Sequence, residues 1–271
     1  MNLDNLLKEI TSIKENDIDD EISMPNVDVV KNIVNETKSV LFPGIYKDKT
    51  EVENDFKELV KNLNEQINIV IKDKEKSEQL VFDFVSKLPE IKKIIITDIE
   101  AIYNGDPAAK TKKEVMLCYP GFFAILTYRI AHLLRSLDIP YLPRMMSEYA
   151  HEKTGIDINP GAVIGESFCI DHGTGIVIGE TSVIGHHVKL YQGVTIGAKS
   201  FKNDENGFPI KGGKRHPDIG DYVTIYANAT ILGGNTKIGS YSTIGGNVWI
   251  TSSVPENTNL IYREYNNGLK E

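Results

Sequence analysis

The sequence is poor in cysteine. Only Cys118 and Cys169 occur among 271 residues, and they form no CxxC pair. A disulfide framework or a cysteine-ligated zinc site is therefore not expected, and a reducing compartment fits this usage best. An excess of basic residues is also missing, because the formal net charge is −8. This charge argues against nucleic acid and against an anionic membrane surface as partners.

Long hydrophobic runs are absent as well. The longest uncharged stretch, Val115 to Tyr128, covers about half a bilayer span and contains Pro120 and Gly121. The first 17 residues alternate charges with single apolar residues and contain no signal-peptide core. Apolar residues make up 41% of the chain and charged residues 25%, as in ordinary globular proteins. We therefore expect a soluble, cytoplasmic protein.

Residues 1–155 have a helical pattern, in which apolar residues recur three and four positions apart, as at Val81, Phe84, Val85 and Leu88. Prolines at positions 25, 43, 89 and 107 are expected to separate the helices, because proline removes a backbone donor. Residues 122–134 form a strongly apolar face, which predicts core packing or a subunit interface. This half indicates an all-helical domain.

After Gly155 the pattern changes to a period of six residues. Its apolar anchors are Ile158, Ile164, Ile170, Ile178, Ile184, Leu190, Ile196, Ile219, Ile225, Ile231, Ile238, Ile244 and Ile250. A parallel β-helix explains this period, because short strands meet at regular corners and each anchor points inward. Seven anchors are followed by glycine, which we expect to relieve strain at the corners. The alternative, an irregular β-sandwich, predicts a period of two.

The repeat predicts a β-helix over residues 156–256, followed by a C-terminal tail, 257–271. Residues 198–214 interrupt the repeat and are rich in glycine, lysine and asparagine. We expect this insertion to leave the prism as a protruding loop. Because the prism interior is apolar, a functional site has to lie on an outer face or between subunits.

His172 is a candidate general base, because imidazole is the side chain best matched to take a proton near pH 7. It lies where the repeat slips by two residues. Asp157 precedes it by fifteen residues, close to one coil of the prism, and is a candidate orienting carboxylate. The alternative is a corner histidine that bonds only to backbone.

Three further residues are candidates, two of them for binding an anion and one for a structural role. Arg215 and His216 end the insertion, where arginine can clamp a carboxylate and histidine can donate beside it. A solvated loop charge is the alternative. Asp106 precedes Pro107, which by itself predicts a helix N-cap with proline at the first helical position.

At these residues the sequence resembles the serine O-acetyltransferases of the hexapeptide-repeat, left-handed β-helix acyltransferases. The matching stretches are GDPAA at 105–109, YPGFFAILTYRIAHLL at 119–134, HEKTGIDINPGAVIG at 151–165, IDHGTGIVIGETSVIG at 170–185, YQGVTIGA at 191–198 and KRHPDIGDYVTIYANATILGG at 214–234. The resemblance covers residues 100–256. Residues 1–95 are similar only in being helical.

The resemblance implies transfer of an acetyl group from acetyl-CoA to the hydroxyl of L-serine, the first step of cysteine synthesis, without a metal ion. By residue-for-residue matching it implies His172 as the base and Asp157 as its orienting carboxylate. The same matching assigns the amino acid to Asp106, Asp171, Arg215 and His216. The pantetheine arm of the cofactor is assigned to Gly197, Ala198, Ala227 and Gly246.

The resemblance also implies partners. Family members form trimers with sites between neighbouring prisms, and helical domains that join two trimers into a hexamer. L-cysteine inhibition is expected because the serine-pocket residues are present. Family members that bind O-acetylserine sulfhydrylase typically end in isoleucine, whereas this tail ends Leu269-Lys270-Glu271, so that complex is not expected here.

Asn159 stands where the family commonly has histidine, and the insertion is about nine residues longer than in the enteric-type members.

Three other functions remain open at this stage. A transferase acting on a sugar or antibiotic hydroxyl shares the repeat but does not need the GDPAA element. A hydratase of the carbonic-anhydrase type needs three converging histidines, and the spacing here lacks its histidine pair. A non-catalytic trimeric scaffold leaves the pairing of Asp157 with His172 accidental. A covalent route through Cys169 is a further possibility, which replacement by alanine tests.

Overall fold

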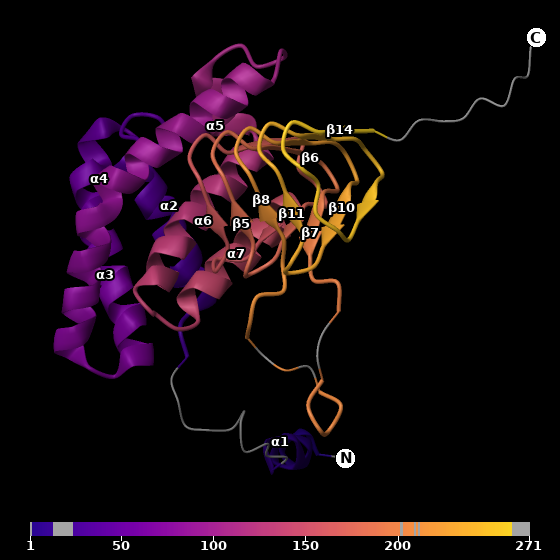
Figure 1. The fold of residues 1–271 in the computed structure, drawn as a ribbon. Helices are drawn as coiled ribbons and strands as arrows, with labels where there is room; N and C mark the ends of the chain where they lie inside the picture. Colours follow the sequence, from indigo (N-terminus) through magenta and orange to yellow (C-terminus); the bar gives the residue numbers. More distant parts are fainter. Residues whose placement is uncertain (1, 13–23, 201–202, 209, 211, 262–271) are drawn as a thin grey trace, which may run out of the picture.

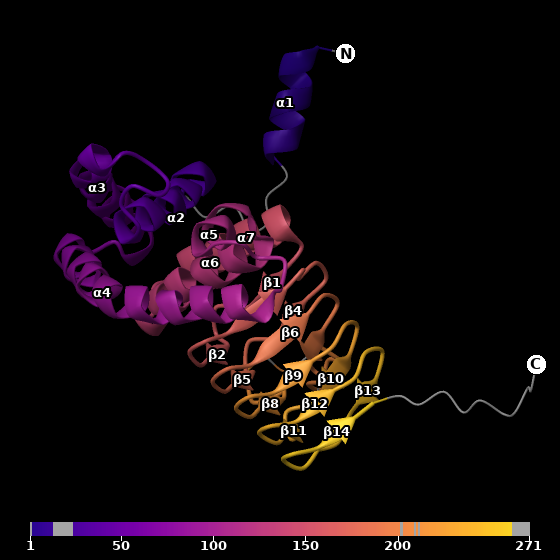
Figure 2. The same ribbon diagram turned by 90° about the horizontal axis from the view of Figure 1, so that it is seen from above.

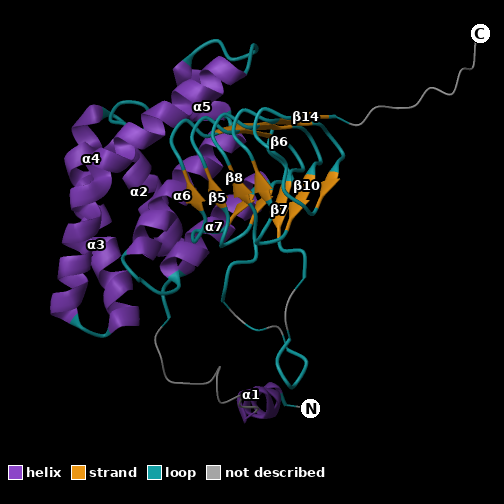
Figure 3. Ribbon diagram, viewed as in Figure 1, coloured by secondary structure: helices purple, strands orange, loops and turns teal. Residues whose placement is uncertain are grey.

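The chain folds into a helical region followed by a parallel β-helix (Figures 1 and 3). The structure is a computed structural model, and it describes residues 2–12, 24–200, 203–208, 210 and 212–261. The helices are α1 (Leu3–Ser12), α2 (Val27–Leu41), the 3-10 helix η1 (Lys49–Glu51), α3 (Val52–Ile71), α4 (Lys74–Gly105), α5 (Lys112–Cys118), α6 (Pro120–Ser136) and α7 (Leu142–Thr154). The final tail residues, 262–271, on which the expectation about the sulfhydrylase depends, lie outside the described part.

The β-helix is built from two- and three-residue strands that form three parallel sheets. The first sheet contains β1 (Asp157–Ile158), β4 (Val177–Ile178), β7 (Thr195–Gly197), β10 (Thr230–Leu232) and β13 (Trp249–Ile250). The second contains β2 (Val163–Ile164), β5 (Val183–Ile184), β8 (Asp218–Ile219) and β11 (Lys237–Ile238). The third contains β3 (Cys169–Asp171), β6 (Lys189–Tyr191), β9 (Thr224–Ile225), β12 (Thr243–Ile244) and β14 (Asn259–Leu260). The expected fold class is therefore confirmed, and Figure 2 shows the coils stacked away from the helices.

The hexapeptide anchors form the interior of this prism. All thirteen are buried, with at most 6% of their surface exposed. They also pair in register: Ile178 faces Ile158 below it and Ile196 above it in the first sheet. The two-residue slip of the sequence is absorbed in the first coil, since Ile158 and Ile178 are twenty positions apart but still pair.

The glycines that follow the anchors have a different role from the one expected. None of them has a positive φ, and the left-handed conformation at the corners is taken mainly by other residues, including Ser167, His187 and Tyr222. What these glycines provide is close approach between coils. A Cβ at Gly165 would lie 2.7 Å from the backbone of Gly185 in the next coil. The expectation that glycine relieves corner strain is therefore wrong for these positions.

Pro89 does not separate two helices, contrary to the expectation from the sequence. It lies inside α4, where it removes one donor from the backbone ladder. The helix continues because it is fixed by tertiary packing on both sides of the proline, with Leu88 and Ile95 buried. The apolar face expected over 122–134 is confirmed as core, because Phe122, Leu126 and Ile130 of α6 are fully buried.

A buried ion pair connects the helices to the first coil. Arg129 of α6 binds both carboxylate oxygens of Asp98 in α4, with two N–O distances of 3.0 Å. The same guanidinium donates to the carbonyls of Ile164 and Gly165 at 2.5 and 2.6 Å. Asp98 in turn accepts the amide of Phe168 at 2.9 Å. Every member of this network has partners, so the helical region and the prism are held in one fixed arrangement.

The insertion leaves the prism between β7 and β8, as expected (Figure 1). Its described part includes a turn in which the Asp204 carboxylate accepts the amides of Asn206 and Phe208, both at 2.9 Å. Among the described residues, no single helix has the length and apolar character needed to cross a membrane. The helices α5 and α6 meet those criteria only as a pair, and they are bent by 77° where they join.

Candidate functional site

The candidate residues lie along two different edges of the prism. The His172 edge consists of the turns from the third sheet to the first, which contain His172, Gln192, Ala227 and Gly246. Backbone hydrogen bonds join these turns, for example from Asn228 to Gln192 and from Asn247 to Ala227, each 2.9 Å. This edge therefore carries the proposed base and two of the four residues that the resemblance assigns to the cofactor.

The His216 edge consists of the turns from the first sheet to the second. It contains Gly179, Gly197, Ala198 and Gly233, together with Arg215 and His216 at the end of the insertion. Gly179 and Gly197 are connected through the first-sheet ladder, because the Gly179 amide donates to Ile196 at 3.0 Å. One side of the prism, about six residues of extended chain or roughly 20 Å, separates the two edges. A single chain therefore does not bring all the candidate residues together.

The His172 edge carries a cluster of charged groups where the end of α4 meets the third sheet. Lys189 lies 2.9 Å from a carboxylate oxygen of Asp171 and donates to the Gly105 carbonyl at 2.6 Å. The His172 Nε2 atom lies 3.8 Å from the other oxygen of Asp171. The side chain of His172 is 75% exposed, and its φ of 58° turns it outward at the corner. The imidazole is thus free to meet a substrate from outside the prism.

Asp106 joins this cluster although it is 66 positions from His172 in sequence. Asp106 is not the N-cap of a helix, contrary to the expectation from the sequence. It ends α4, and its Oδ1 atom accepts the Ala108 amide at 2.8 Å in a local turn. Its Oδ2 atom accepts the hydroxyl of Tyr119 at 2.6 Å. The Tyr119 hydroxyl and the Ala108 amide hold the pKa of Asp106 below its ordinary value, so the carboxylate is charged at neutral pH.

Asp157 is placed on the outer face of the first sheet, in β1. Its carboxylate lies near the ends of Glu148 and His151 of α7, within 4.8 Å of both. Among the described residues, no hydrogen bond or ion pair joins Asp157 to His172. The carboxylate that stands within 4 Å of His172 is Asp171. The pairing of Asp157 with His172 stays a prediction.

Cys169 lies in β3 under the end of α4, and it is 5% exposed. A side chain at Gly105 would approach its sulfur to 3.2 Å, which shows how closely the helix covers it. Burial raises the pKa of the Cys169 thiol to about 12. The thiol is therefore protonated at neutral pH and is not a nucleophile.

On the other edge, Arg215 and His216 are both held by the turn between β4 and β5. The Arg215 guanidinium pairs with Glu180 at 2.5 Å. The His216 side chain packs over Gly179, where a Cβ atom would overlap the imidazole ring. Burial, followed by the charge of Arg215, lowers the pKa of His216 to about 4. His216 is therefore a neutral imidazole at neutral pH.

Comparison with known proteins matches these features to one family. The family model of the serine acetyltransferase N-terminal region matches residues 40–127. A plasmid-encoded serine acetyltransferase of Synechococcus elongatus is 51% identical over 177 residues, 65% of this chain and 55% of the relative. The crystal structure of serine acetyltransferase 1 from Entamoeba histolytica, in complex with L-cysteine, is 36% identical, covers 96% of both chains and has a TM-score of 0.78. The chain belongs to the serine acetyltransferase family.

A further serine acetyltransferase structure, a complex with CoA, is 29% identical and covers 86% of this chain and 95% of its own, with a TM-score of 0.57. The chain spans about half to two thirds of the length of the first curated relatives it matches. These likenesses confirm the resemblance stated from the sequence motifs.

Sequence reasoning missed several residues of the two candidate edges. Tyr119 and Lys189 hold Asp106 and Asp171, and Thr181 and Glu180 hold His216 and Arg215. Tyr119, Glu180 and Thr181 all lie within motifs quoted above, and Lys189 lies outside them. Their partners are 13 to 35 positions away, and only the folded chain brings them into contact.

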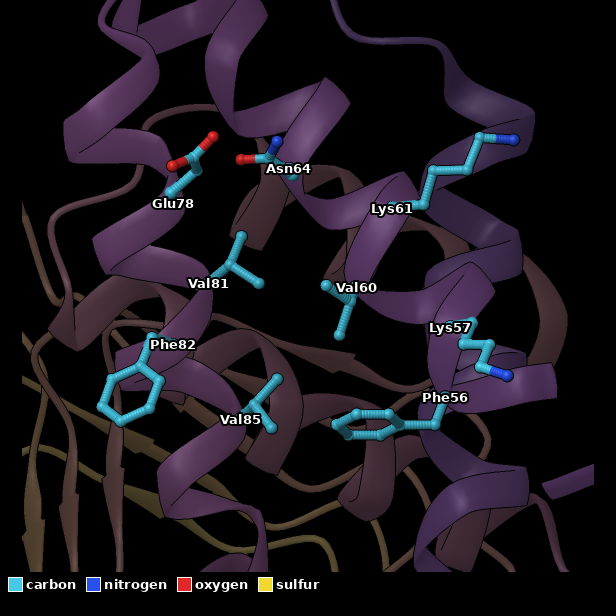
Figure 4. A pocket seen from close by; sticks show the side chains of 9 residues that line it. All are labelled: Phe56, Lys57, Val60, Lys61, Asn64, Glu78, Val81, Phe82 and Val85. Carbon is cyan, nitrogen blue, oxygen red and sulfur yellow. The ribbon is translucent and has the colours of Figure 1, made fainter. Parts of the chain in front are cut away.

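One apolar cavity coincides with neither edge. It is a groove of about 490 Å³ between α3 and α4, lined by Phe56, Lys57, Val60, Lys61, Asn64, Glu78, Val81, Phe82 and Val85 (Figure 4). Both overall views place α3 on the side of the helical region away from the β-helix (Figures 1 and 2). A cavity of about 600 Å³ with a mixed polar and apolar lining lies instead at the His216 edge, lined in part by Lys199, Lys214 and Arg215.

Proposed function

We propose that this chain transfers an acetyl group from acetyl-CoA to the hydroxyl of L-serine, giving O-acetyl-L-serine and CoA. The observation that carries the proposal is the grouping of Asp106, Asp171 and His172 at one edge, in a chain of the serine acetyltransferase family. Serine acetyltransferases solved with L-cysteine and with CoA support the two kinds of ligand. Such a reaction supplies the acetylated serine from which cysteine is made.

In this mechanism His172 acts as the general base. Its imidazole takes the proton from the serine hydroxyl as the oxygen attacks the thioester carbonyl. The tetrahedral intermediate then breaks its C–S bond, and the departing CoA sulfur receives the proton from His172. Direct transfer fits the protonated state of the buried Cys169 thiol. Asp157 is proposed to orient His172 once substrate and a neighbouring subunit are in place.

The ammonium and carboxylate groups of serine are each bound by side chains of the opposite charge. Asp106 is the best partner for the ammonium group, because its carboxylate is charged and forms no ion pair among the described residues, although the charge of Lys189 acts on it from a distance. Asp171 adds negative charge, although Lys189 already neutralises part of it. Arg215 and His216 are proposed to bind the carboxylate. Residues 1–155 thus contribute Asp106 to the serine site.

The two edges can form one site only if they come from different copies of the chain. A cyclic trimer does this, since the His172 edge of each prism then faces the His216 edge of the next. The cofactor assignment follows the same division, with Ala227 and Gly246 on one edge and Gly197 and Ala198 on the other. We therefore propose a homotrimer with acetyl-CoA between prisms, and helical regions that can join two trimers.

Release of the CoA thiol from acetyl-CoA, measured with and without L-serine, tests the function. Wild-type protein should release thiol only with serine, and His172→Ala should lose about 10²–10⁴ of the rate. His187→Ala is the matched control, because His187 is also exposed and left-handed, in a turn from the second sheet to the third. Its rate should stay within about twofold of wild type. Absence of serine-dependent release, in protein that still binds acetyl-CoA, would move the acceptor to a sugar or other hydroxyl.

L-cysteine is proposed to compete with serine, since it presents the same ammonium and carboxylate to the site. Loss of the thioester absorbance of acetyl-CoA should slow when millimolar L-cysteine is added below saturating serine. Saturating serine should restore the rate. An unchanged rate at low serine would refute the competition.

A further inference from the structure

Thr181 contacts both residues of the His216 edge that are proposed to bind the substrate carboxylate. It lies in the turn between β4 and β5, one coil before them. Its hydroxyl oxygen accepts the amide of Arg215 at 3.0 Å and the amide of His216 at 3.1 Å. Its own amide donates to the His216 Nδ1 atom at 3.0 Å, and its hydroxyl lies 2.9 Å from the same atom. One threonine therefore fixes the backbone and the ring of this segment.

These contacts determine which nitrogen of His216 carries the proton. A backbone N–H can only donate, so the Nδ1 atom that receives it from Thr181 must be unprotonated. The hydroxyl of Thr181 can donate its hydrogen to the same nitrogen while its oxygen accepts the two amides. In the neutral imidazole the remaining proton is then on Nε2.

The charged groups around His216 agree with a neutral ring. Arg215 and Lys214 both disfavour a second positive charge there, and the opposing carboxylate of Glu180 is engaged by Arg215. Lys214 in turn pairs with Asp218 and donates to the Thr181 carbonyl at 2.6 Å. The ring has no space to turn, because it lies against Gly179. Both the tautomer and the orientation are thus set by the neighbouring turn.

We propose that Thr181 is a positioning residue that holds His216 as a neutral Nε2–H donor and fixes the Arg215–His216 backbone for binding the carboxylate of the amino acid. The part that concerns the carboxylate rests on the proposed function. The part that concerns the tautomer does not, since it follows from contacts within the chain.

Replacing the hydroxyl by a methyl group tests the positioning role. Thr181→Val keeps the shape and β-branching of threonine but leaves the amides of Arg215 and His216 without their acceptor. We expect the KM for serine to rise about 10–100-fold, the range for losing a hydrogen bond to the charged carboxylate of serine when the Arg215–His216 segment is no longer held in place. The KM for acetyl-CoA should change much less. Thr181→Ser, which keeps the hydroxyl, should return to within about threefold of wild type. Thr243→Val, on the third sheet, is the matched control and should be unchanged.

Nitrogen NMR of histidine-labelled protein tests the tautomer without any activity. The His216 signals are identified by their loss in His216→Gln. Wild type at pH 7 should show an unprotonated Nδ1 and a protonated Nε2, and Thr181→Val should keep this tautomer, because valine retains the backbone N–H that donates to Nδ1. A charged ring or a proton on Nδ1 in wild type would overturn the proposal. A wild-type KM for serine in Thr181→Val would also overturn it. If serine is not the substrate, the NMR result is unaffected, so the two failures are distinguishable.

Discussion

The buried pair of Arg129 and Asp98 offers the sharpest test of how the helices are joined to the prism. The two side chains are 5% and 0% exposed. Replacing Arg129 by methionine keeps most of the side-chain volume but removes the whole donor set. The Asp98 carboxylate would then keep only the amide of Phe168, and the carbonyls of Ile164 and Gly165 would lose their donor.

The burial of the pair determines the expected loss in the free energy of unfolding. Removing one partner of a buried ion pair costs about 3–5 kcal/mol, because the remaining charge is left in a poorly polarisable site. The unpaired carbonyls place Arg129→Met at the upper end of that range. Asp98→Asn should also lower the free energy of unfolding. The double variant should lose about 1–3 kcal/mol less than the sum of the two single variants, because each substitution removes the charge that would otherwise leave the other side chain unpaired.

Urea unfolding followed by circular dichroism, at one fixed protein concentration, measures these differences. Arg135→Met is the matched control. It removes an arginine from the same helix, whose partner Asp138 lies 3.5 Å away and is 94% exposed. Its cost should stay below about 0.5 kcal/mol. A loss below about 1 kcal/mol in Arg129→Met, or strict additivity in the double variant, would refute the reasoning.

Three further outcomes follow from the site. Cys169→Ala should keep most of the transfer rate, because the buried thiol is protonated; a loss as deep as that of His172→Ala would reopen a covalent route. Tyr119→Phe should raise the KM for serine about tenfold with little change in the KM for acetyl-CoA, because Asp106 loses its 2.6 Å hydrogen bond; equal effects on both would contradict this role. The lowered pKa of His216 means that, between pH 6.5 and about 4, the unfolded chain binds more protons than the folded one, so stability falls as pH drops through this window. From pH 7 to 5 wild type should lose about 2 kcal/mol more than His216→Gln in urea unfolding, and equal slopes would be inconsistent with a neutral His216.

The sequence predicts the prism well because its period is a direct consequence of the geometry. Each anchor, such as Ile178 or Ile196, lies inside one short strand, and neighbouring coils must pair in register to bury it. The helical half is less specific. A proline normally ends a helix, and only the tertiary packing of α4 explains why Pro89 does not.

The local signals around Asp106 and the anchor glycines were ambiguous for physical reasons. An aspartate before proline accepts a nearby amide both at a helix N-cap and in a local turn, and the structure forms the turn. Glycine at a corner suggests positive φ, whereas Gly165 is required for the distance between coils. Tyr119, Lys189 and Thr181 depend on contacts between distant segments, which no local pattern encodes.

In the proposed trimer, each site combines the His172 edge of one copy with the His216 edge of the next. Co-expression of His172→Ala and Arg215→Ala chains, with different tags to isolate mixed oligomers, tests it most directly. Each parent should be inactive alone. In every mixed trimer isolated in this way, one site in three joins an intact His172 edge to an intact His216 edge, so about a third of the wild-type rate should return. Mixed oligomers as inactive as their parents would show that the two edges do not form a site between copies.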